Sequence, residues 1–164
     1  MNPVVSKKAE SVVNLLKERG LTIATAESCT GGLLSGAITS VSGASQVFEL
    51  GVTSYSCRIK NEILGVDEET LRELGAVSEP TARQMAENVR KLAKSDIAAS
   101  VTGVAGPLGS EGHPVGYIFI AVSSEKGTEV SLLNLENNGR EAVREAAVAA
   151  LFDLIENYVK GNLE

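Results

Sequence analysis

The stretch from Thr25 to Gly36 constrains the fold of this chain more than any other. An apolar run, Leu21 to Ala26, leads into it and has the length of a short buried strand. Small and polar residues follow, then a glycine pair, and then an apolar run with helical spacing. The pattern predicts a strand–turn–helix unit that carries a hydroxyl, a thiol and a carboxylate at its turn.

This turn is a candidate catalytic site. The first backbone N–H groups of a helix lack intrahelical partners, and the helix dipole favours negative charge there. Glycine lets a ligand approach these groups closely, so we expect Ser28 to lie where a developing oxyanion is held. Turns rich in Ser, Thr and Gly also serve as simple helix caps, so the local pattern leaves both interpretations open.

Composition limits the class of partner. A chain of 164 residues predicts one domain, 1–164, and a net charge of -6 with 4% aromatic residues argues against a nucleic-acid surface. No apolar run has the length of a membrane span, and no signal-peptide core is visible, so we expect a cytoplasmic protein that does not bind membranes. Two cysteines, Cys29 and Cys57, fit a reducing compartment. With a single histidine, we expect neither a metal site nor a cofactor.

Hydrophobic periodicity, helix caps and turn residues predict the order of the elements. The clearest signal is Ser78-Glu79-Pro80, with serine at a helix cap and proline in the first turn. The predicted helices span residues 5–19, 31–41, 56–64, 67–74, 78–93 and 139–158. The predicted strands span residues 21–26, 48–55, 97–102, 116–123 and 128–135, with Gly51 at a possible bulge.

Strands alternate with helices early in the chain, and a hairpin comes late. This order predicts a three-layer α/β/α sandwich on a mixed, mostly parallel sheet with a late antiparallel hairpin. Ligands of such sheets bind at the carboxyl ends of the strands. Three segments should therefore converge: the turn at Ser28, the segment Tyr55–Lys60 and the glycine-rich loop after Thr102.

A serine nucleophile needs a base. His113 lies in the glycine-rich loop and no aspartate pairing is evident, so a Ser–His–Asp triad is not expected. Lys60 lies one turn into a helix that leaves a strand end, where it can point back over the sheet. Burial would lower the pKa of its amine and keep it neutral, whereas a surface lysine would be solvated and charged. We expect Tyr55 to hydrogen-bond to the amine or to Ser28 and to steer the proton.

Cys29 offers a second candidate nucleophile. With Glu27 and Lys60 it matches the composition of a Cys–Glu–Lys amidase. Neighbours on an extended segment point to opposite sides, however, so Ser28 and Cys29 should not both face one pocket. Small buried cysteines are usually inert, and Ser28 is the preferred nucleophile.

The loop at 103–112 has glycines in a G-x-x-G-x-x-G pattern, which is neither a dinucleotide fingerprint nor a Walker loop. It can form a backbone nest for a phosphate or ribose, or a plain surface hairpin. Arg140 and Arg144 stand one turn apart at the start of the last helix, where they can clamp a phosphate. Glu141 and Glu145 can instead pair with them in surface salt bridges.

Six segments keep a characteristic order and spacing. They are Thr25-Ala-Glu-Ser-Cys-Thr-Gly-Gly32, Tyr55-Ser56 with Lys60, Leu64-Gly65-Val66, Gly75-Ala-Val-Ser-Glu-Pro80, Thr102-Gly-Val-Ala-Gly-Pro107 and Pro114-Val-Gly116. Over about residues 5–155 the chain thereby resembles the CinA C-terminal domain family, whose characterised members are nicotinamide-mononucleotide amidohydrolases. It looks like a stand-alone version of a domain that larger members carry behind an N-terminal domain.

The resemblance implies a metal-independent Ser–Lys amidohydrolase that converts nicotinamide mononucleotide to nicotinate mononucleotide and ammonia. It implies Ser28 as nucleophile, Lys60 as base and Tyr55 as the assisting tyrosine, and it suggests a homodimer or higher oligomer. The residues that we expect to bind substrate are Thr30, Gly31, Gly32, Thr102, Gly103, Ala105, Gly106, Arg140 and Arg144.

The chain departs from the family pattern near the predicted site. Cys57 stands where the family usually has asparagine, Ser110 follows Gly109 where a second glycine is usual, and His113 replaces a lysine before Pro114. These changes leave Ser28 and Lys60 in place. They keep two alternatives open: a nucleotide-binding or regulatory module with little turnover, and hydrolysis of another small amide or ester.

Overall fold

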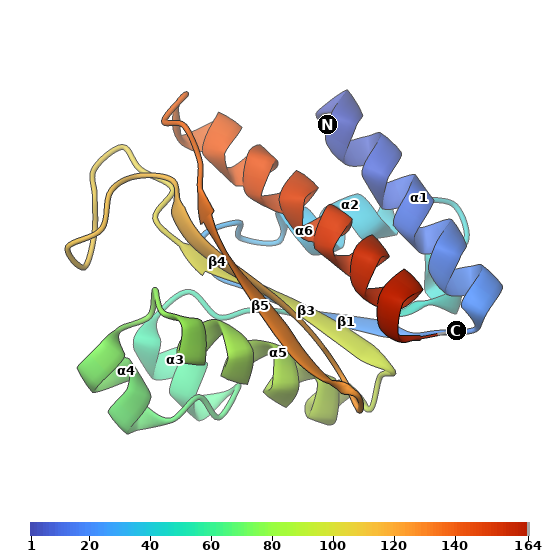
Figure 1. The fold of residues 1–164 in the computed structure, drawn as a ribbon, viewed down its shortest axis with the longest axis horizontal. Helices are drawn as coiled ribbons and strands as arrows, with labels where there is room; N and C mark the ends of the chain where they lie inside the picture. Colours follow the sequence, from blue (N-terminus) through green and yellow to red (C-terminus); the bar gives the residue numbers. More distant parts are fainter. Residues whose placement is uncertain (164) are drawn as a thin grey trace.

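A five-stranded sheet with helices on both faces forms the centre of the computed structural model, which describes residues 1–163 (Figure 1). The helices are α1 (Pro3–Arg19), α2 (Leu33–Thr39), α3 (Cys57–Glu62), α4 (Glu68–Leu74), α5 (Glu79–Ala93) and α6 (Arg140–Asn162), with a 3₁₀ turn, η1 (Ala44–Gln46). The strands are β1 (Ile23–Glu27), β2 (Phe48–Thr53), β3 (Ile97–Gly103), β4 (Tyr117–Ser124) and β5 (Gly127–Asn134).

The strands lie in the order β2-β1-β3-β4-β5. Strand β1 pairs in parallel with β2 and β3, whereas β4 pairs antiparallel with both β3 and β5. The predicted fold class, a mixed sheet with a late antiparallel hairpin, is confirmed. Because β1 is flanked by parallel strands, its carboxyl end opens beside the ends of β2 and β3, which brings three connections together.

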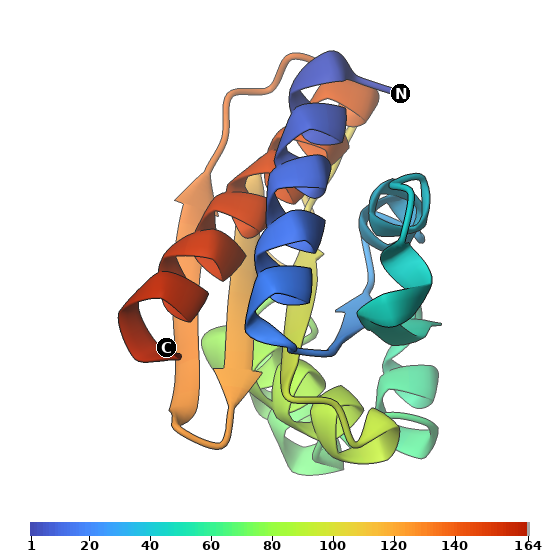
Figure 2. The same ribbon diagram turned by 90° about the vertical axis from the view of Figure 1, so that its right-hand side faces the viewer.

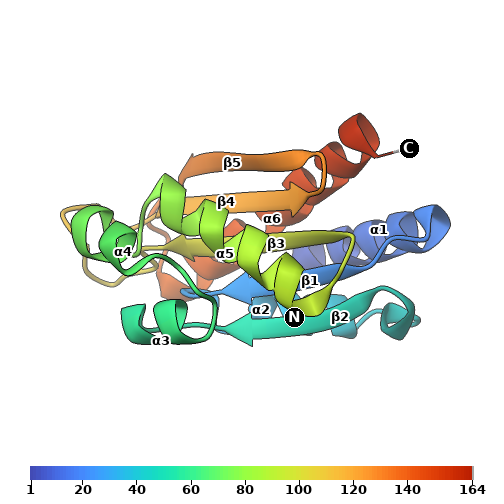
Figure 3. The ribbon, with the colours of Figure 1, turned by 90° about the horizontal axis from the view of Figure 1, so that it is seen from below.

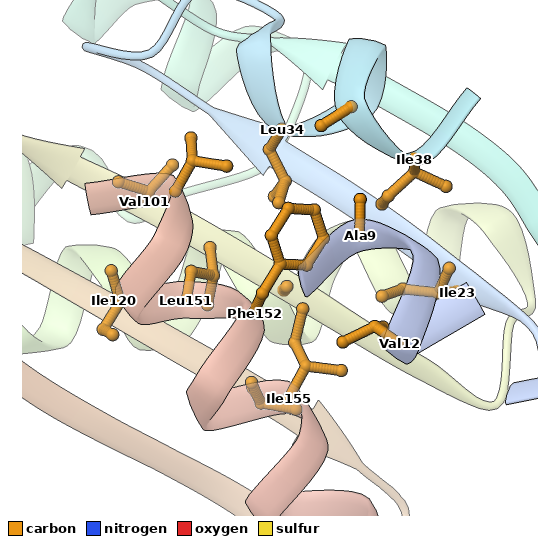
Figure 4. Packing of buried hydrophobic residues seen from close by; sticks show 14 of the residues in the cluster. Ala9, Val12, Ile23, Leu34, Ile38, Val101, Ile120, Leu151, Phe152 and Ile155 are labelled. Carbon is orange, nitrogen blue, oxygen red and sulfur yellow. The ribbon is translucent and has the colours of Figure 1, made fainter. Parts of the chain in front are cut away.

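Two helical layers cover the sheet. Helices α1, α2 and α6 lie over one face and α3, α4 and α5 over the other, as Figures 2 and 3 show from two further directions. On the first face, Phe152 of α6 packs among Leu34 and Ile38 of α2 and Ala9 of α1 (Figure 4). All five residues of β1 are buried, as expected for a central strand covered on both faces.

The helix predicted from Ser78-Glu79-Pro80 is confirmed as α5. The Ser78 side chain caps α5 by accepting a hydrogen bond from the Thr81 N–H at 3.3 Å. Met85 and Val89 of this helix pack on the second face of the sheet, against the alanines of β1 and β3. Helix α1 likewise ends at Gly20, whose φ of 64° is the left-handed conformation that glycine adopts without strain.

The predicted bulge at Gly51 is wrong. The register shifts at Glu49 instead, because Ile23 pairs with Phe48 and Ala24 already pairs with Leu50. Glycine at 51 has a packing reason instead: a Cβ there would lie 3.1 Å from side-chain atoms of Phe48, Ser35 and Thr25. Within residues 1–163, none of the helices combines the length and apolar character needed to cross a bilayer.

Candidate active site

The turn after β1 holds Ser28 at the carboxyl end of the central strand. The Ser28 N–H donates to the Val101 carbonyl of β3 at 3.0 Å, and the Ser28 carbonyl accepts from the Gly31 N–H at 3.0 Å. Gly31 and Gly32 have φ angles of 58° and 102°, which strain any residue with a Cβ. The glycine pair therefore lets the chain turn tightly and enter α2. Ser28 as a whole is 8% exposed.

Lys60 reaches Ser28 from α3. Its Nζ lies 2.8 Å from Ser28 Oγ and donates to the main-chain carbonyls of Ser54 and Tyr55 at 2.7 and 3.1 Å. Ser56 caps α3 by accepting from the Ile59 N–H, so the helix starts where Lys60 points back toward the strand end. The structure thus brings together two residues that lie far apart in the sequence.

The surroundings of Lys60 favour its neutral form. The residue is 0% exposed, and no carboxylate among residues 1–163 lies within salt-bridge distance of it. Burial lowers the pKa of the amine, because the charged form loses its hydration. A neutral amine can donate to the two carbonyls and keep its lone pair for the Ser28 hydroxyl, which is the arrangement that a general base requires.

Cys29 lies beside the pair but is not activated. The residue is buried, and burial raises the pKa of its thiol to about 11. The thiolate, which is the nucleophilic form, is therefore scarce at neutral pH. This environment favours Ser28 over Cys29 as the nucleophile.

Glu27 closes the N-terminus of α2, so the expectation of open helix N–H groups is wrong. Its carboxylate accepts from the N–H groups of Leu34 and Ser35 at 2.8 and 3.1 Å and from the hydroxyls of Thr30 and Ser35 at 2.6 and 2.9 Å. Those donors cannot also bind an oxyanion. All four hydrogen bonds go to residues 30–35, so the alternative Cys–Glu–Lys grouping with Lys60 is not formed.

A cleft of about 220 Å³ lies beside the pair. Its lining includes Cys29 from the turn, Tyr55 after β2, the loop Gly103–Gly106, and Arg140 at the start of α6. Three segments predicted to converge, the Ser28 turn, the Tyr55–Lys60 segment and the glycine-rich loop, therefore meet at this edge of the sheet.

Arg140 and Tyr55 bridge the two sides of the cleft. The guanidinium donates to the Gly106 carbonyl and, at 2.9 Å, to the Tyr55 hydroxyl. The expected bond from this hydroxyl to Lys60 or Ser28 is not formed, because Tyr55 is 60% exposed and turns outward; only its carbonyl contacts the amine.

Other predicted contacts lie outside the cleft lining. The Thr102 hydroxyl donates to the Ala76 carbonyl at 2.8 Å and so anchors the connection between α4 and α5. Arg144 donates to the carbonyls of Cys29 and Thr30 at 3.1 and 2.8 Å. The alternative pairing of the two arginines with Glu141 and Glu145 is not seen among the described salt bridges; Glu145 accepts from Asn2 instead.

Glu111 is a site-supporting residue that the sequence pattern did not reveal. Its carboxylate accepts from the N–H groups of Ala76 and Val77 at 3.2 and 3.1 Å, which ties the cleft loop to the start of α5. His113 stabilises the same loop by stacking on Tyr117, with ring centroids 4.0 Å apart. The Glu111 contact has no local signal, because it joins residues that lie more than thirty positions apart in the sequence.

The fold and the site together define a class: an α/β/α protein with a buried serine–lysine pair at the carboxyl end of its central strand. The chain belongs to the CinA C-terminal domain family, whose model matches residues 5–159. The resemblance predicted from the motifs is confirmed.

Relatives and solved structures agree with this assignment. A competence-damage inducible protein of Caldanaerobacter subterraneus is 50% identical over 93% of this chain, and one of Streptococcus pneumoniae is 46% identical over 90%. The chain spans little more than a third of these relatives, 37% and 35% of their lengths. The structure of competence/damage inducible protein CihA from Agrobacterium tumefaciens is 35% identical, with a TM-score of 0.91 over 95% of this chain and 96% of that one. Competence damage-inducible protein A from Klebsiella pneumoniae is 31% identical, with a TM-score of 0.93 over 96% and 98%.

Proposed function

We propose that this protein is an amidohydrolase that deamidates nicotinamide mononucleotide through an acyl-serine intermediate. The observation that carries the proposal is the 2.8 Å contact between the buried Lys60 amine and the Ser28 hydroxyl. Membership of the CinA C-terminal domain family supports the choice of substrate, because characterised members of that family act on this nucleotide. The products are nicotinate mononucleotide and ammonia.

In the acylation step, Ser28 Oγ attacks the carbonyl carbon of the amide while neutral Lys60 takes the hydroxyl proton. The carbonyl oxygen becomes an oxyanion in the tetrahedral intermediate. The Lys60 ammonium then gives its proton to the amide nitrogen, the C–N bond breaks, and ammonia leaves. The base is neutral again at the end of this step, with the acyl group on Ser28.

In the deacylation step, Lys60 takes a proton from a water molecule, and the resulting hydroxide attacks the ester carbon. The proton passes back to Ser28 Oγ as the ester bond breaks, and the acid product leaves as a carboxylate after giving its remaining proton to solvent. Each step needs a donor for the oxyanion. Cys29 lines the cleft, and its N–H donates to no other residue among those described, so it is our candidate for that donor.

Substrate binding is assigned to the cleft beside the pair. Arg140 supplies a guanidinium to a protein whose net charge is -6, and a phosphate can take the hydrogen bonds that it now gives to Gly106 and Tyr55. The loop from Gly103 to Gly106 lines the other wall. We also retain Thr30, Gly31, Gly32 and Thr102 as supports of the two walls.

The family departures leave Ser28 and Lys60 in place, and one of them, Ser110, lines the cleft. Cys57 is exposed at the start of α3 and lines a separate groove between α3 and α4. His113 stacks on Tyr117 and is not among the residues that line the cleft. His113 therefore lies outside the cleft, whereas Cys57 lies one turn before Lys60 on α3 and acts to raise the pKa of its amine.

Ammonia release from nicotinamide mononucleotide tests the proposal. We expect activity in the wild type, none in Ser28→Ala or Lys60→Ala, and most of it in Cys29→Ala. Loss of activity in Cys29→Ala alone would refute the Ser–Lys assignment. Thermal stabilisation by the nucleotide without any ammonia would instead indicate a binding module, and activity on unrelated amides only would indicate another substrate.

We further propose that the chain assembles at least as a homodimer. A shallow groove between α1 and α6 is lined by Val4, Ala146, Ala149 and Ala150 together with polar residues, and Val4 is exposed. Small apolar side chains allow close approach of a second copy. Light scattering at micromolar concentration would show a dimer or larger species, and a monomer would contradict this proposal.

A further inference from the structure

Arg144 joins α6 to the turn that carries Ser28. Its Nε donates to the Cys29 carbonyl at 3.1 Å and its Nη2 to the Thr30 carbonyl at 2.8 Å. The guanidinium thus holds two consecutive peptide groups of the turn from an element that is more than a hundred residues away. A rigid, planar group with several donors is suited to such a double contact.

The contacts of Arg144 complete the hydrogen bonding of the turn. The Ser28 carbonyl accepts from the Gly31 N–H, and the Thr30 carbonyl accepts from the Leu33 N–H as well as from Arg144. Every carbonyl from Ser28 to Thr30 therefore has a donor. The N–H groups of Cys29, Thr30 and Gly32 are left without a partner in another residue of the described chain, and of these three residues only Cys29 lines the cleft.

Peptide geometry indicates where the Cys29 N–H points. The C=O and N–H of a trans peptide point in opposite directions. The Ser28 carbonyl faces inward to Gly31, so the Cys29 N–H of the same peptide faces out of the turn. Cys29 lines the cleft, which is where the oxygen of a substrate carbonyl bound to Ser28 would lie.

Arg144 does not occupy the position of a phosphate ligand. The cleft lining includes Arg140 but not Arg144. The Arg144 Nη2 lies against the turn, 3.6 Å from where a Cβ on Gly31 would be. Two of its nitrogens are committed to main-chain oxygens, and none of the described salt bridges joins it to a carboxylate.

We infer that Arg144 is a positioning residue, which fixes the Ser28 turn so that the Cys29 N–H donates to the oxyanion of the reaction. The inference rests on the proposed amidohydrolase function and replaces the expected role of Arg144 in clamping a phosphate. The positive charge beside the turn acts in the same direction, because it favours negative charge on the reacting oxygen.

Steady-state kinetics separate the two roles of an arginine. An oxyanion donor acts in the transition state, so Arg144→Gln should lower kcat by about 100-fold and change KM by no more than about twofold. A phosphate ligand would give the reverse pattern, a raised KM with kcat kept. The pH midpoint of activity should not move, because Lys60 keeps its three contacts. A raised KM at unchanged kcat overturns the inference.

A fluorophosphonate probe tests the turn without the natural substrate. Ser28 Oγ forms a bond to phosphorus, fluoride leaves, and Lys60 takes the hydroxyl proton, while the phosphoryl oxygen occupies the oxyanion position. We expect Arg144→Gln to be labelled at least about tenfold more slowly than the wild type. Arg72→Gln removes an exposed guanidinium on α4 and serves as the matched control with an unchanged rate.

Separate measurements distinguish a variant that does not fold from a folded variant with altered activity. Thermal unfolding shows whether Arg144→Gln is folded, and Arg144→Lys, with one point charge, is the second variant should it not be. Added guanidinium should restore labelling of Arg144→Ala but not of Lys60→Ala. A folded Arg144 variant labelled at the wild-type rate overturns the inference. A wild type that is labelled at Ser28 but releases no ammonia from the nucleotide refutes the proposed function and leaves the positioning role standing.

Discussion

Replacing Lys60 by methionine should change how the stability of the protein depends on pH. Lys60 is fully buried, and its partners are two carbonyls and a hydroxyl. Burial lowers the pKa of its amine below the ordinary value of 10.5. The unfolded chain therefore binds one more proton than the folded chain at every pH between the folded pKa and 10.5.

The sign follows from this difference in protons. Stability rises with pH wherever the unfolded state holds more protons, so this group makes the folded protein more stable as the pH increases toward 10.5. The slope is about 1.4 kcal/mol per pH unit, and it disappears below the folded pKa, where both states are protonated. Methionine has a similar length and no titrating group. Over two pH units inside this window, the free energy of unfolding of the wild type should gain up to about 2.7 kcal/mol relative to Lys60→Met.

Urea unfolding of both proteins at several pH values from neutral to alkaline measures this difference. Lys60→Met also loses hydrogen bonds, but this loss lowers the free energy of unfolding by the same amount at every pH. The difference in slope between the two proteins therefore reports only the titration of Lys60. The same pKa governs catalysis: the rate of ammonia release should rise about tenfold per pH unit and level off where the stability slope begins. Parallel stability curves would refute a neutral buried Lys60, and so would a rate that does not rise with pH below the point where the stability slope begins.

Three further perturbations test neighbouring parts of the site. Iodoacetamide should alkylate the exposed Cys57 at neutral pH and spare Cys29, whose thiol pKa burial raises to about 11; equal rates by mass spectrometry would contradict this. Glu27→Gln should lower the free energy of unfolding by about 1–3 kcal/mol in urea, because an amide nitrogen cannot accept and leaves buried donors unpaired. An unchanged urea midpoint would show that the Glu27 hydrogen bonds do not contribute to the free energy of unfolding. Arg140→Ala should raise KM for nicotinamide mononucleotide by about tenfold or more. Nicotinamide riboside, which lacks the phosphate, is the control substrate. An equal rise in KM for both substrates would show that Arg140 does not bind the phosphate.

Local patterns were sufficient to predict most of the fold, whereas the choice of Lys60 over a solvated surface lysine depended on the resemblance to the family. The apolar run before Thr25 and the glycine pair after it predict the strand–turn–helix, and Ser78 with Pro80 predicts α5. Most element ends lie within two residues of the prediction; β2, for example, ends at Thr53 rather than at Tyr55, but α6 continues four residues further, to Asn162. Main-chain pairing with β1 decides that end, and no residue type marks it.

Side-chain contacts with main-chain groups could not be predicted in this way. Glu27, Glu111 and Arg144 each bind main-chain groups, and backbone N–H and C=O groups carry no sequence signature. Arg144 was therefore assigned to a phosphate because its charge and its spacing from Arg140 were visible, whereas the two carbonyls that it binds were not. Charge patterns predict that an arginine has an anionic or polar partner, but the fold decides which one.

Glu27 and Lys60 are both buried near the turn, but Glu27 stabilises the structure and Lys60 is the proposed base. Glu27 accepts four hydrogen bonds, two of them from the N-terminus of α2, and so holds the turn. Lys60 donates only to neutral groups. Burial has the largest effect on the pKa of its amine and lowers it, which outweighs the opposite effect of Cys57, Cys29 and Glu111. A carboxylate placed beside Lys60 would stabilise the ammonium and with it the folded protein, but it would remove the lone pair that Ser28 needs. A carboxylate in place of the Ser54 or Tyr55 carbonyl would therefore prevent Lys60 from acting as a base. The folded protein is less stable below pH 10.5 because the site keeps the Lys60 amine neutral.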